Sequence, residues 1–290
     1  MARSPTHTFG QEIGNLFQEA VEPVLQAFAN EHGLFLDKKG PRPARGTRKL
    51  VRWRDRSGNE HDLDFVLEEG GTPDTIGTPR AFIEAAYRRY TKHSRNKAQE
   101  IQGAVLPVRD MHGDAAPFIG AILAGVFTED ALEQMRSLGF CVLYFPWETV
   151  VAAFGTVGVD VHFEEDTLDA EVEEKLRDWR AVPDTERALV AEALIQTNGP
   201  EVRRFMAALE RAVTRRIQIV RVLPLHGTPA ELPSVADAID FIQDYDEALP
   251  GVKVVAKYEV EIRYSNGDRV QGQFTSKETA IHFLRAYPRN

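Results

Sequence analysis

Two acidic residues, Asp64 and Glu84, stand within short apolar runs of the sequence, and a group of cations follows them between Arg88 and Lys97. Paired carboxylates are ligands that Mg²⁺ prefers, together with water and the phosphate of a substrate. An ammonium group beside such an ion orients water and stabilises the charge of the transition state. These residue types in this order therefore predict metal-dependent attack on a phosphodiester bond.

The elements that must position these residues are short strands. Apolar runs bounded by turn residues predict a meander of three strands, at 49–54, 62–68 and 80–87. Asp64 and Glu84 then stand on neighbouring strands. Alternation along the second strand places Leu63, Phe65 and Leu67 on one face, with Asp62, Asp64 and Val66 on the other.

Helices and further strands surround this meander. An amphipathic pattern predicts a helix at 9–30, which Pro23 should kink or divide. Ser94 is a good N-cap for a helix at about 95–105, and Pro107 is expected to stop that helix. A strand at 118–127, a helix at 129–138 and a strand at 141–145 follow. This alternation predicts an α/β crossover with parallel pairing.

The remainder of the chain has a different character. Three acid-rich helical patterns, near 167–180, 184–197 and 200–215, predict a helical bridge. Beyond it, 234–245 and 276–287 share Ser, Ala-Ile, Phe and Tyr at identical offsets, which predicts two related strand–helix units on one small sheet. We therefore expect a core at 1–160, a helical insertion at 161–215 and a small α+β module at 216–290.

The order helix, three strands, helix, strand, helix and strand over residues 9–145, with Asp64 and Glu84 in place, resembles the PD-(D/E)XK nuclease superfamily. Its restriction-endonuclease-like branch is the most similar, and the resemblance covers about half of the chain. It implies an α/β fold with a restriction-endonuclease-like core, in which helices flank a mixed sheet. It also implies that Asp64 and Glu84 bind Mg²⁺ and that a lysine assists the attacking water.

The lysine of that motif is missing from its usual place. The sequence reads Glu84-Ala85-Ala86, so alanine stands where the superfamily usually has lysine. Some members carry this cation on the following helix, where Lys97 is the best substitute and Lys92 the next. Lys97 can equally be an ordinary cation of the helix surface, and His93 is a weaker candidate for a general base. Second-tier candidates on the same helix are Gln99 and Glu100.

The two acids also have structural alternatives. Asp62 can take the role of the motif acid in place of Asp64, or it can be a residue of a turn. Glu84 lies among apolar neighbours, where an unpaired carboxylate is costly to bury. An ion pair with Arg88 or Arg52 is therefore the structural explanation of Glu84.

Positive charge gathers around these residues, although the chain as a whole carries a formal net charge of −9. Residues 1–99 hold 16 of the 35 Lys and Arg but only 13 of the 44 Asp and Glu. The stretch 37–47 reads as a basic loop that either follows a phosphate backbone or serves as a linker. A basic face beside two acids favours double-stranded DNA as the partner. The expected DNA contacts are Arg52, Arg54, Arg88, Arg89, Lys92 and Arg95.

We expect a Mg²⁺-dependent DNA endonuclease of the restriction or defence type, with a homodimer as one way to cut both strands. The alternative is a catalytically inactive DNA-binding or scaffold relative of the same fold. A small-molecule enzyme lacks support, because the sequence has no phosphate-binding glycine loop, no Gly-x-Ser-x-Gly and no zinc-ligand spacing. With no apolar run of bilayer length and no secretory signal, a cytoplasmic protein without a membrane partner is expected.

Overall fold

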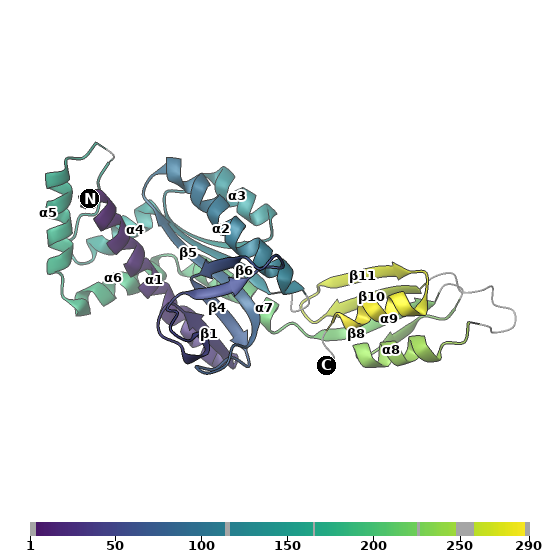
Figure 1. Cartoon of the computed structure of the whole chain (residues 1–290). Helices are drawn as coiled ribbons and strands as arrows, with labels where there is room; N and C mark the ends of the chain where they lie inside the picture. Colours follow the sequence, from purple (N-terminus) through teal and green to yellow (C-terminus); the bar gives the residue numbers. More distant parts are fainter. Residues whose placement is uncertain (1–3, 114–116, 165, 225–226, 248–257, 288–290) are drawn as a thin grey trace. The chain divides into compact units, whose positions relative to one another are not determined.

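The structure is a computed structural model that describes residues 4–113, 117–164, 166–224, 227–247 and 258–287, without the side chains of 91–93. The chain divides into two compact units, of which the first ends at Leu209 and the second begins at Glu210 (Figure 1). The helices α5 (Asp169–Ala181), α6 (Asp184–Thr197) and the larger part of α7 (Gly199–Val213) belong to the first unit. The segment expected as a helical insertion is thus mostly part of the same compact unit as the expected core.

A five-stranded mixed sheet with the order β1-β4-β5-β6-β7 forms the centre of the first unit. The pairs β1–β4 and β4–β5 are antiparallel, whereas β5–β6 and β6–β7 are parallel. The α/β class and the parallel crossover expected after the meander are therefore confirmed. The strands are β1 (Leu34–Lys38), β4 (Phe65–Glu69), β5 (Thr78–Arg88), β6 (Phe118–Gly125) and β7 (Cys141–Pro146).

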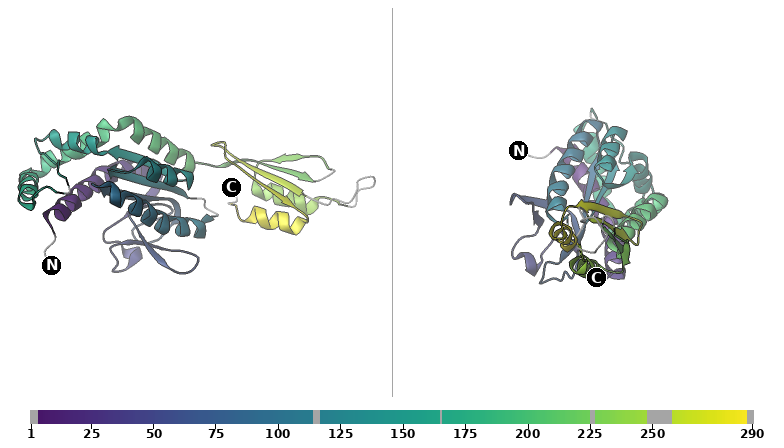
Figure 2. Two further views of the ribbon diagram at one scale, coloured as in Figure 1. Left: turned by 90° about the horizontal axis from the view of Figure 1, so that it is seen from above. Right: turned by 90° about the vertical axis from the view of Figure 1, so that its right-hand side faces the viewer.

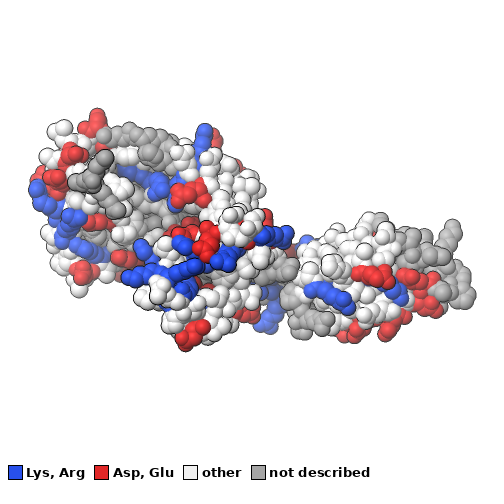
Figure 3. Space-filling model, viewed as in Figure 1, with Lys and Arg blue, Asp and Glu red and all other residues white. Residues whose placement is uncertain are grey.

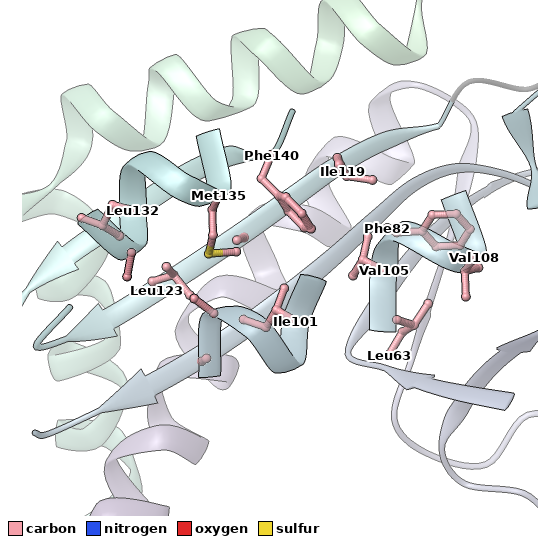
Figure 4. Packing of buried hydrophobic residues seen from close by; sticks show 14 of the residues in the cluster. Leu63, Phe82, Ile101, Val105, Val108, Ile119, Leu123, Leu132, Met135 and Phe140 are labelled. Atoms are coloured by element: carbon pink, nitrogen blue, oxygen red, sulfur yellow. The ribbon is translucent and has the colours of Figure 1, made fainter. Parts of the chain in front are cut away.

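Helices lie on both sides of this sheet (Figure 2). On one side, α2 (Thr91–Met111) and α3 (Glu129–Ser137) share a buried apolar cluster with the strands, in which Phe82, Ile101 and Met135 take part (Figure 4). The helices α1 (Pro5–Glu31) and α4 (Trp147–Gly155) contact the sheet through other side chains. Each fully buried large apolar side chain contributes about 1.5–3 kcal/mol, so the two layers hold the strand ends rigidly in place.

The first strand of the expected meander was placed wrongly. The predicted strand at 49–54 is β2 (Val51–Arg54), and it pairs with β3 (Glu60–Leu63) in a separate two-stranded sheet. The central sheet instead takes β1, which overlaps the start of the basic loop predicted at 37–47. Leu36 and Asp37 are buried in this strand, and the two lysines that follow Asp37 conceal its apolar pattern in the sequence.

The predicted second strand at 62–68 is divided at Asp64. The residues before Asp64 belong to β3, those after it belong to β4, and Asp64 itself is a bend. As a result Leu63 and Val66 lie in one buried cluster, whereas strict alternation would place them on opposite faces. Periodicity cannot reveal such a change of partner, because both halves of the run keep a strand pattern.

The predicted helix boundaries also need correction. α2 begins at Thr91 with Tyr90 as its N-cap, so Ser94 is a buried residue within the helix and not its cap. Pro107 does not stop α2, because the helix continues to Met111 with Val108 fully buried in the apolar cluster. α1 likewise runs unbroken through Pro23. Packing of the apolar faces therefore outweighs the hydrogen bond that each proline removes.

The second unit contains the two strand–helix repeats expected from the sequence. Its antiparallel sheet has the order β11-β10-β8-β9, and the hairpin turn between β10 and β11 contains Gly267 at φ +91°. The side chains of Ser234 and Ser276 cap the two helices at equivalent positions of the repeat. The elements are β8 (Ile217–Pro224), β9 (Ala230–Leu232), α8 (Val235–Asp244), β10 (Tyr258–Tyr264), β11 (Arg269–Phe274) and α9 (Lys277–Arg285).

Candidate active site

Asp64 and Glu84 meet across two antiparallel strands. In the pairing of β4 with β5, Phe65 lies opposite Ile83, so the next step places Asp64 beside Glu84. The backbone N–H of Ala85 donates to Asp64 Oδ2 at 2.9 Å, and the backbone N–H of Asp64 donates to Glu84 Oε1 at 3.0 Å. Each carboxylate is thus held by the backbone of the other strand, at the bend where the regular ladder ends.

Glu84 is buried and Asp64 is half-buried. Glu84 is 6% exposed, and burial together with the Asp64 carboxylate raises the pKa of Glu84 to about 8. Burial also raises the pKa of Asp64, against the opposing effects of the Ala85 N–H and the Lys97 ammonium. Two neighbouring carboxylates repel each other when both are ionised. The pair as it stands is therefore short of positive charge.

Lys97 brings a cation to this pair from α2. Its ammonium lowers the pKa of Asp64 and of Glu84, and the side chain is 16% exposed. The Nζ atom donates to Glu100 Oε1 at 2.6 Å, one turn further along the helix. Lys97 thus interacts with three carboxylates, and the Glu100 side chain is the most exposed of them at 64%. Lys97 offsets only part of the negative charge of these three carboxylates, so a further cation would still be attracted to them.

The chemistry of the donors fits a hard divalent cation. Mg²⁺ is commonly held by one or two carboxylates, with water and phosphate oxygens in its remaining positions. Asp64 and Glu84 supply such a pair, and the Glu100 charge also acts on Glu84. No cluster of three or more His, Cys, Asp or Glu placed to hold a metal occurs among the described residues. Asp64 and Glu84 thus offer two carboxylate ligands, and water and phosphate oxygens would have to fill the other positions.

A cavity of about 600 Å³ opens beside the pair. Its walls are one face of α1, the end of β5 and the beginning of α2. The volume lies within the range of roughly 300–1,000 Å³ that is typical of ligand sites. The structure brings most of the predicted site residues to this cavity, namely Asp62, Asp64, Glu84, Arg88, Arg89, Lys97 and Glu100.

Asp64, and not Asp62, is the acid that meets Glu84. The Asp62 side chain is 47% exposed, and its carboxylate accepts a hydrogen bond of 2.6 Å from Arg52 Nε. The arginines considered as partners of Glu84 are engaged elsewhere. Arg52 pairs with Asp62 and Glu60, and Arg88 Nη1 donates to the backbone oxygen of Tyr87 at 2.8 Å.

Arg89 is tied into the protein more tightly than the other predicted DNA contacts whose side chains the structure describes. Its side chain is only 9% exposed, and the guanidinium lies 4.4 Å from the ring centroid of Trp147. The same guanidinium donates to the backbone oxygen of Phe163 and to Glu164. Arg89 therefore fastens the segment after α4 to the end of β5, as well as lining the cavity.

The other predicted residues whose side chains the structure describes are not part of the cavity lining. Arg54 is on β2 and pairs with Glu60, which also binds Arg48 and Arg52. Arg95 and Gln99 are exposed on α2. The side chains of Lys92 and His93 lie outside the described residues, so the roles expected of these two residues stay predictions.

Two residues near the acids were not anticipated from the sequence. Gln18 of α1 donates from Nε2 to Asp64 Oδ1 at 3.2 Å, and the exposed Lys39 lowers the pKa of Asp64. Gln18 is 46 residues away from Asp64 in sequence. The only sequence signal for Gln18 is its position on a polar face of an amphipathic helix, which many surface residues share.

Lys and Arg side chains gather in a band across the first unit, with Asp and Glu among them (Figure 3). The contacts explain this mixture. Three arginines of the basic stretch, Arg48, Arg52 and Arg54, all pair with Glu60 on the adjacent strand β3. Part of the positive charge that the sequence suggested for DNA is thus already matched within the hairpin β2–β3.

A second cluster of buried acids lies in the same sheet. Glu68 of β4 is fully buried, and both its oxygens accept hydrogen bonds from Arg42, at 2.7 and 2.9 Å. Asp37 of β1 pairs with Arg42 at 2.8 Å and with Arg45 at 3.2 Å. The Gly77 N–H also donates to Glu68 at 2.7 Å. This cluster pairs two acids with two arginines.

The chain matches no family model and no curated protein. Among solved structures it is similar to a crystal structure described as a protein of unknown function, AF1548, at 16% identity and a TM-score of 0.29. The match covers 68% of this chain and 98% of that chain. A TM-score this low carries no argument about fold or function. None of the described helices is both long and apolar enough to cross a bilayer.

Proposed function

We propose that the chain is a Mg²⁺-dependent endonuclease of the PD-(D/E)XK, restriction-endonuclease-like type, which hydrolyses phosphodiester bonds of double-stranded DNA. The observation that carries the proposal is the pair of the half-buried Asp64 and the buried Glu84, side by side at the wall of a cavity with the Lys97 ammonium nearby. The order α1, three antiparallel strands, α2, β6, α3 and β7 supports the same class.

The residues of the site have separate roles in this proposal. Asp64 and Glu84 hold the ion, and Gln18 fixes the orientation of the Asp64 carboxylate through its hydrogen bond. A bound Mg²⁺ neutralises phosphate charge and favours ionisation of a water molecule. Lys97, on the next helix, stabilises the charge that develops on the phosphate and replaces the lysine absent at Ala86. Glu100 positions the Lys97 ammonium until substrate arrives.

Incubation of supercoiled plasmid with the purified chain and Mg²⁺ or Mn²⁺ tests this proposal. We expect nicked or linear products from the wild type and none from Glu84→Gln, which keeps the shape of the side chain but not its charge. Glu69→Gln is the matched control, because Glu69 is an exposed acid at the other end of β4. No cleavage with either ion, or equal cleavage by Glu84→Gln, would contradict the proposal.

The alternative proposal is a DNA-binding protein of the same class that does not cleave. It is favoured by Ala86 at the motif position and by the contact that engages Lys97 with Glu100. The two proposals separate when binding and cleavage are measured on the same DNA. Metal-independent binding without cleavage in Mg²⁺, Mn²⁺ or Co²⁺ would select the non-cleaving protein, whereas metal-dependent nicking selects the nuclease.

A further inference from the structure

The cavity beside Asp64 and Glu84 is larger than two carboxylates and one ion require. Its volume of about 600 Å³ extends from the acids along α1 to the end of β5. A continuous duplex keeps its phosphates on its outer surface and its bases stacked inside. A protein cavity of this size therefore suits a single nucleotide that has left the stack, as happens when chemistry is done on extruded or unpaired nucleotides.

The wall formed by α1 is polar but carries no cation. Gln11, Asn15 and Gln18 line the cavity from one face of the helix, at the spacing i, i+4, i+7. No Lys or Arg occurs anywhere in α1. Surfaces that follow the phosphate backbone of a duplex depend on such cations. Asn and Gln side chains, by contrast, match the donor and acceptor pattern of base edges.

Tyr87, on β5, lies against this wall. A Cβ added to Gly14 would be 3.7 Å from Tyr87 Cβ, and one added to Gly10 would be 4.0 Å from Tyr87 Cε1. These are ordinary contact distances, so Tyr87 packs directly against this part of α1.

The hydroxyl group of Tyr87 lacks a hydrogen-bond partner among the described residues. Tyr87 is 8% exposed and lines the cavity, and its Oη atom is buried without a hydrogen-bond partner among the described residues. A buried polar group without a partner is destabilising. Because this oxygen is enclosed by the protein, a base or sugar in the cavity would reach it only after the Tyr87 side chain shifts, whereas Tyr90 already lines the cavity and its ring offers a surface for stacking.

Charged groups lie at the two ends of the cavity and neutral groups lie between them, as a base lies between two phosphates in a nucleic acid strand. The carboxylates and Lys97 lie at one end, where an ion and the scissile phosphate would bind. Neutral amides and aromatic rings form the middle. Arg88, which donates one hydrogen bond to the Tyr87 backbone, lies at the other end with donors for the next phosphate.

We infer that this cavity is a binding subsite for one unpaired nucleotide next to the scissile phosphate. The inference rests on the proposed nuclease function and narrows its substrate. The preferred DNA then contains a single-stranded segment at the cleavage position, such as a flap, a gap or a frayed end. A continuous duplex binds less tightly, because a nucleotide must first be unpaired and unstacked.

Binding of labelled DNA to the full-length Glu84→Gln variant tests this inference without any cleavage. Fluorescence anisotropy compares a continuous duplex with the same duplex carrying an unpaired flap of a few nucleotides. We expect the flap DNA to bind about tenfold more tightly, the effect of roughly one stacked base. Equal affinities would overturn the inference.

A bulky residue in the cavity provides the second measurement. Asn15→Trp places a large ring on the exposed α1 wall of the cavity and should remove the tenfold preference for the flap. Asn30→Trp, an exposed asparagine of the same helix outside the cavity lining, should keep it. Identical behaviour of the two variants would overturn the inference.

The outcome also separates this inference from the proposed function. Nicking of plasmid by the wild type with no preference for the flap DNA would remove the subsite and leave the nuclease. A flap preference that Asn15→Trp removes, without cleavage by the wild type, would retain the subsite on a protein that only binds. Failure of Glu84→Gln to bind any of these DNAs would overturn the subsite.

Discussion

The central sheet contains two pairs of acids, and their surroundings differ. Asp37 and Glu68 are enclosed by Arg42 and Arg45, whose guanidinium groups contact the carboxylates at 2.7–3.2 Å. Asp64 and Glu84 receive hydrogen bonds from backbone N–H groups and from Gln18. The nearby Lys97 ammonium is also bound to Glu100. Both pairs lie on the same sheet, four residues apart on or beside β4.

Under the proposed function, this difference separates a structural cluster from the metal site. Arg42 presents a bidentate fork to Glu68 and also donates to the backbone oxygens of Thr72 and Thr75, so it closes the loop after β4. The Asp64–Glu84 pair faces a cavity, and there burial raises the pKa of Glu84 to about 8. Two arginines match the charges of Asp37 and Glu68, whereas Asp64 and Glu84 receive their hydrogen bonds from backbone N–H groups and from Gln18. Under the proposed function, the second pair would hold the cation.

The largest effect should follow from removing the charge of the cavity pair. Glu84→Gln is expected to lower the rate of plasmid cleavage on the order of a thousandfold, because it removes a ligand that the transition state requires. Circular dichroism should show an unchanged fold, since the amide oxygen can still accept the hydrogen bond from the Asp64 N–H. A variant that retained cleavage would show that the pair is structural.

The opposite behaviour is expected when the arginine cluster is altered. Arg42→Ala leaves two buried carboxylates without their main partner and should lower the free energy of unfolding by about 3–5 kcal/mol. Urea denaturation measures this loss, and Arg54→Ala is the control because the Arg54 side chain is 68% exposed. If Arg42→Ala were as stable as Arg54→Ala, the two acid pairs would not differ as described.

Lys97 should matter for the rate more than for stability. Lys97→Ala is expected to lower kcat by about 10²-fold through the loss of the ammonium beside the phosphate, with little change in ion binding. Lys39→Ala is the comparison, because Lys39 is exposed and acts only on Asp64 among the two acids. Single-turnover cleavage measures the rate of each variant. A greater loss of rate in Lys39→Ala than in Lys97→Ala would show that Lys39, and not Lys97, acts on the phosphate.

The pH dependence of stability provides a smaller but distinct effect. Because the pKa of Glu84 is about 8 in the folded protein and near 4.5 when unfolded, the folded state binds the extra proton between these values. The stability of the metal-free protein should therefore fall as the pH rises from about 5 to 8. Thermal unfolding of the wild type and Glu84→Gln over this range tests the sign. A wild type that gained stability relative to the variant would contradict it.

The sequence predicted the pair of acids better than the strands that carry it. Asp64 and Glu84 stand out because acids are rare within apolar strand runs, and this local signal survives errors in strand assignment. Strand β1 was overlooked because its apolar residues run into two lysines. The bend at Asp64 has no local signature either, since both sides of it read as strand.

Partners that are distant in sequence could not be predicted in the same way. Gln18 and Lys39 reach Asp64 only through the packing of α1 and β1 on the sheet. For the basic stretch, the sequence shows the residues but not their partners. Its arginines were visible in the sequence, but their pairing with Glu60 depends on the register of β2 against β3, where Arg54 lies opposite Glu60.

Calorimetric titration of Mn²⁺ into the metal-free protein at pH 8 tests the central claim most directly. We predict binding of the ion to the wild type, accompanied by release of a proton from Glu84, and loss of that binding in Asp64→Asn and Glu84→Gln. Glu68→Gln, if folded, should still bind the ion. Equal heats of binding in the wild type and the two cavity variants would contradict the assignment of Asp64 and Glu84 as the metal-binding pair.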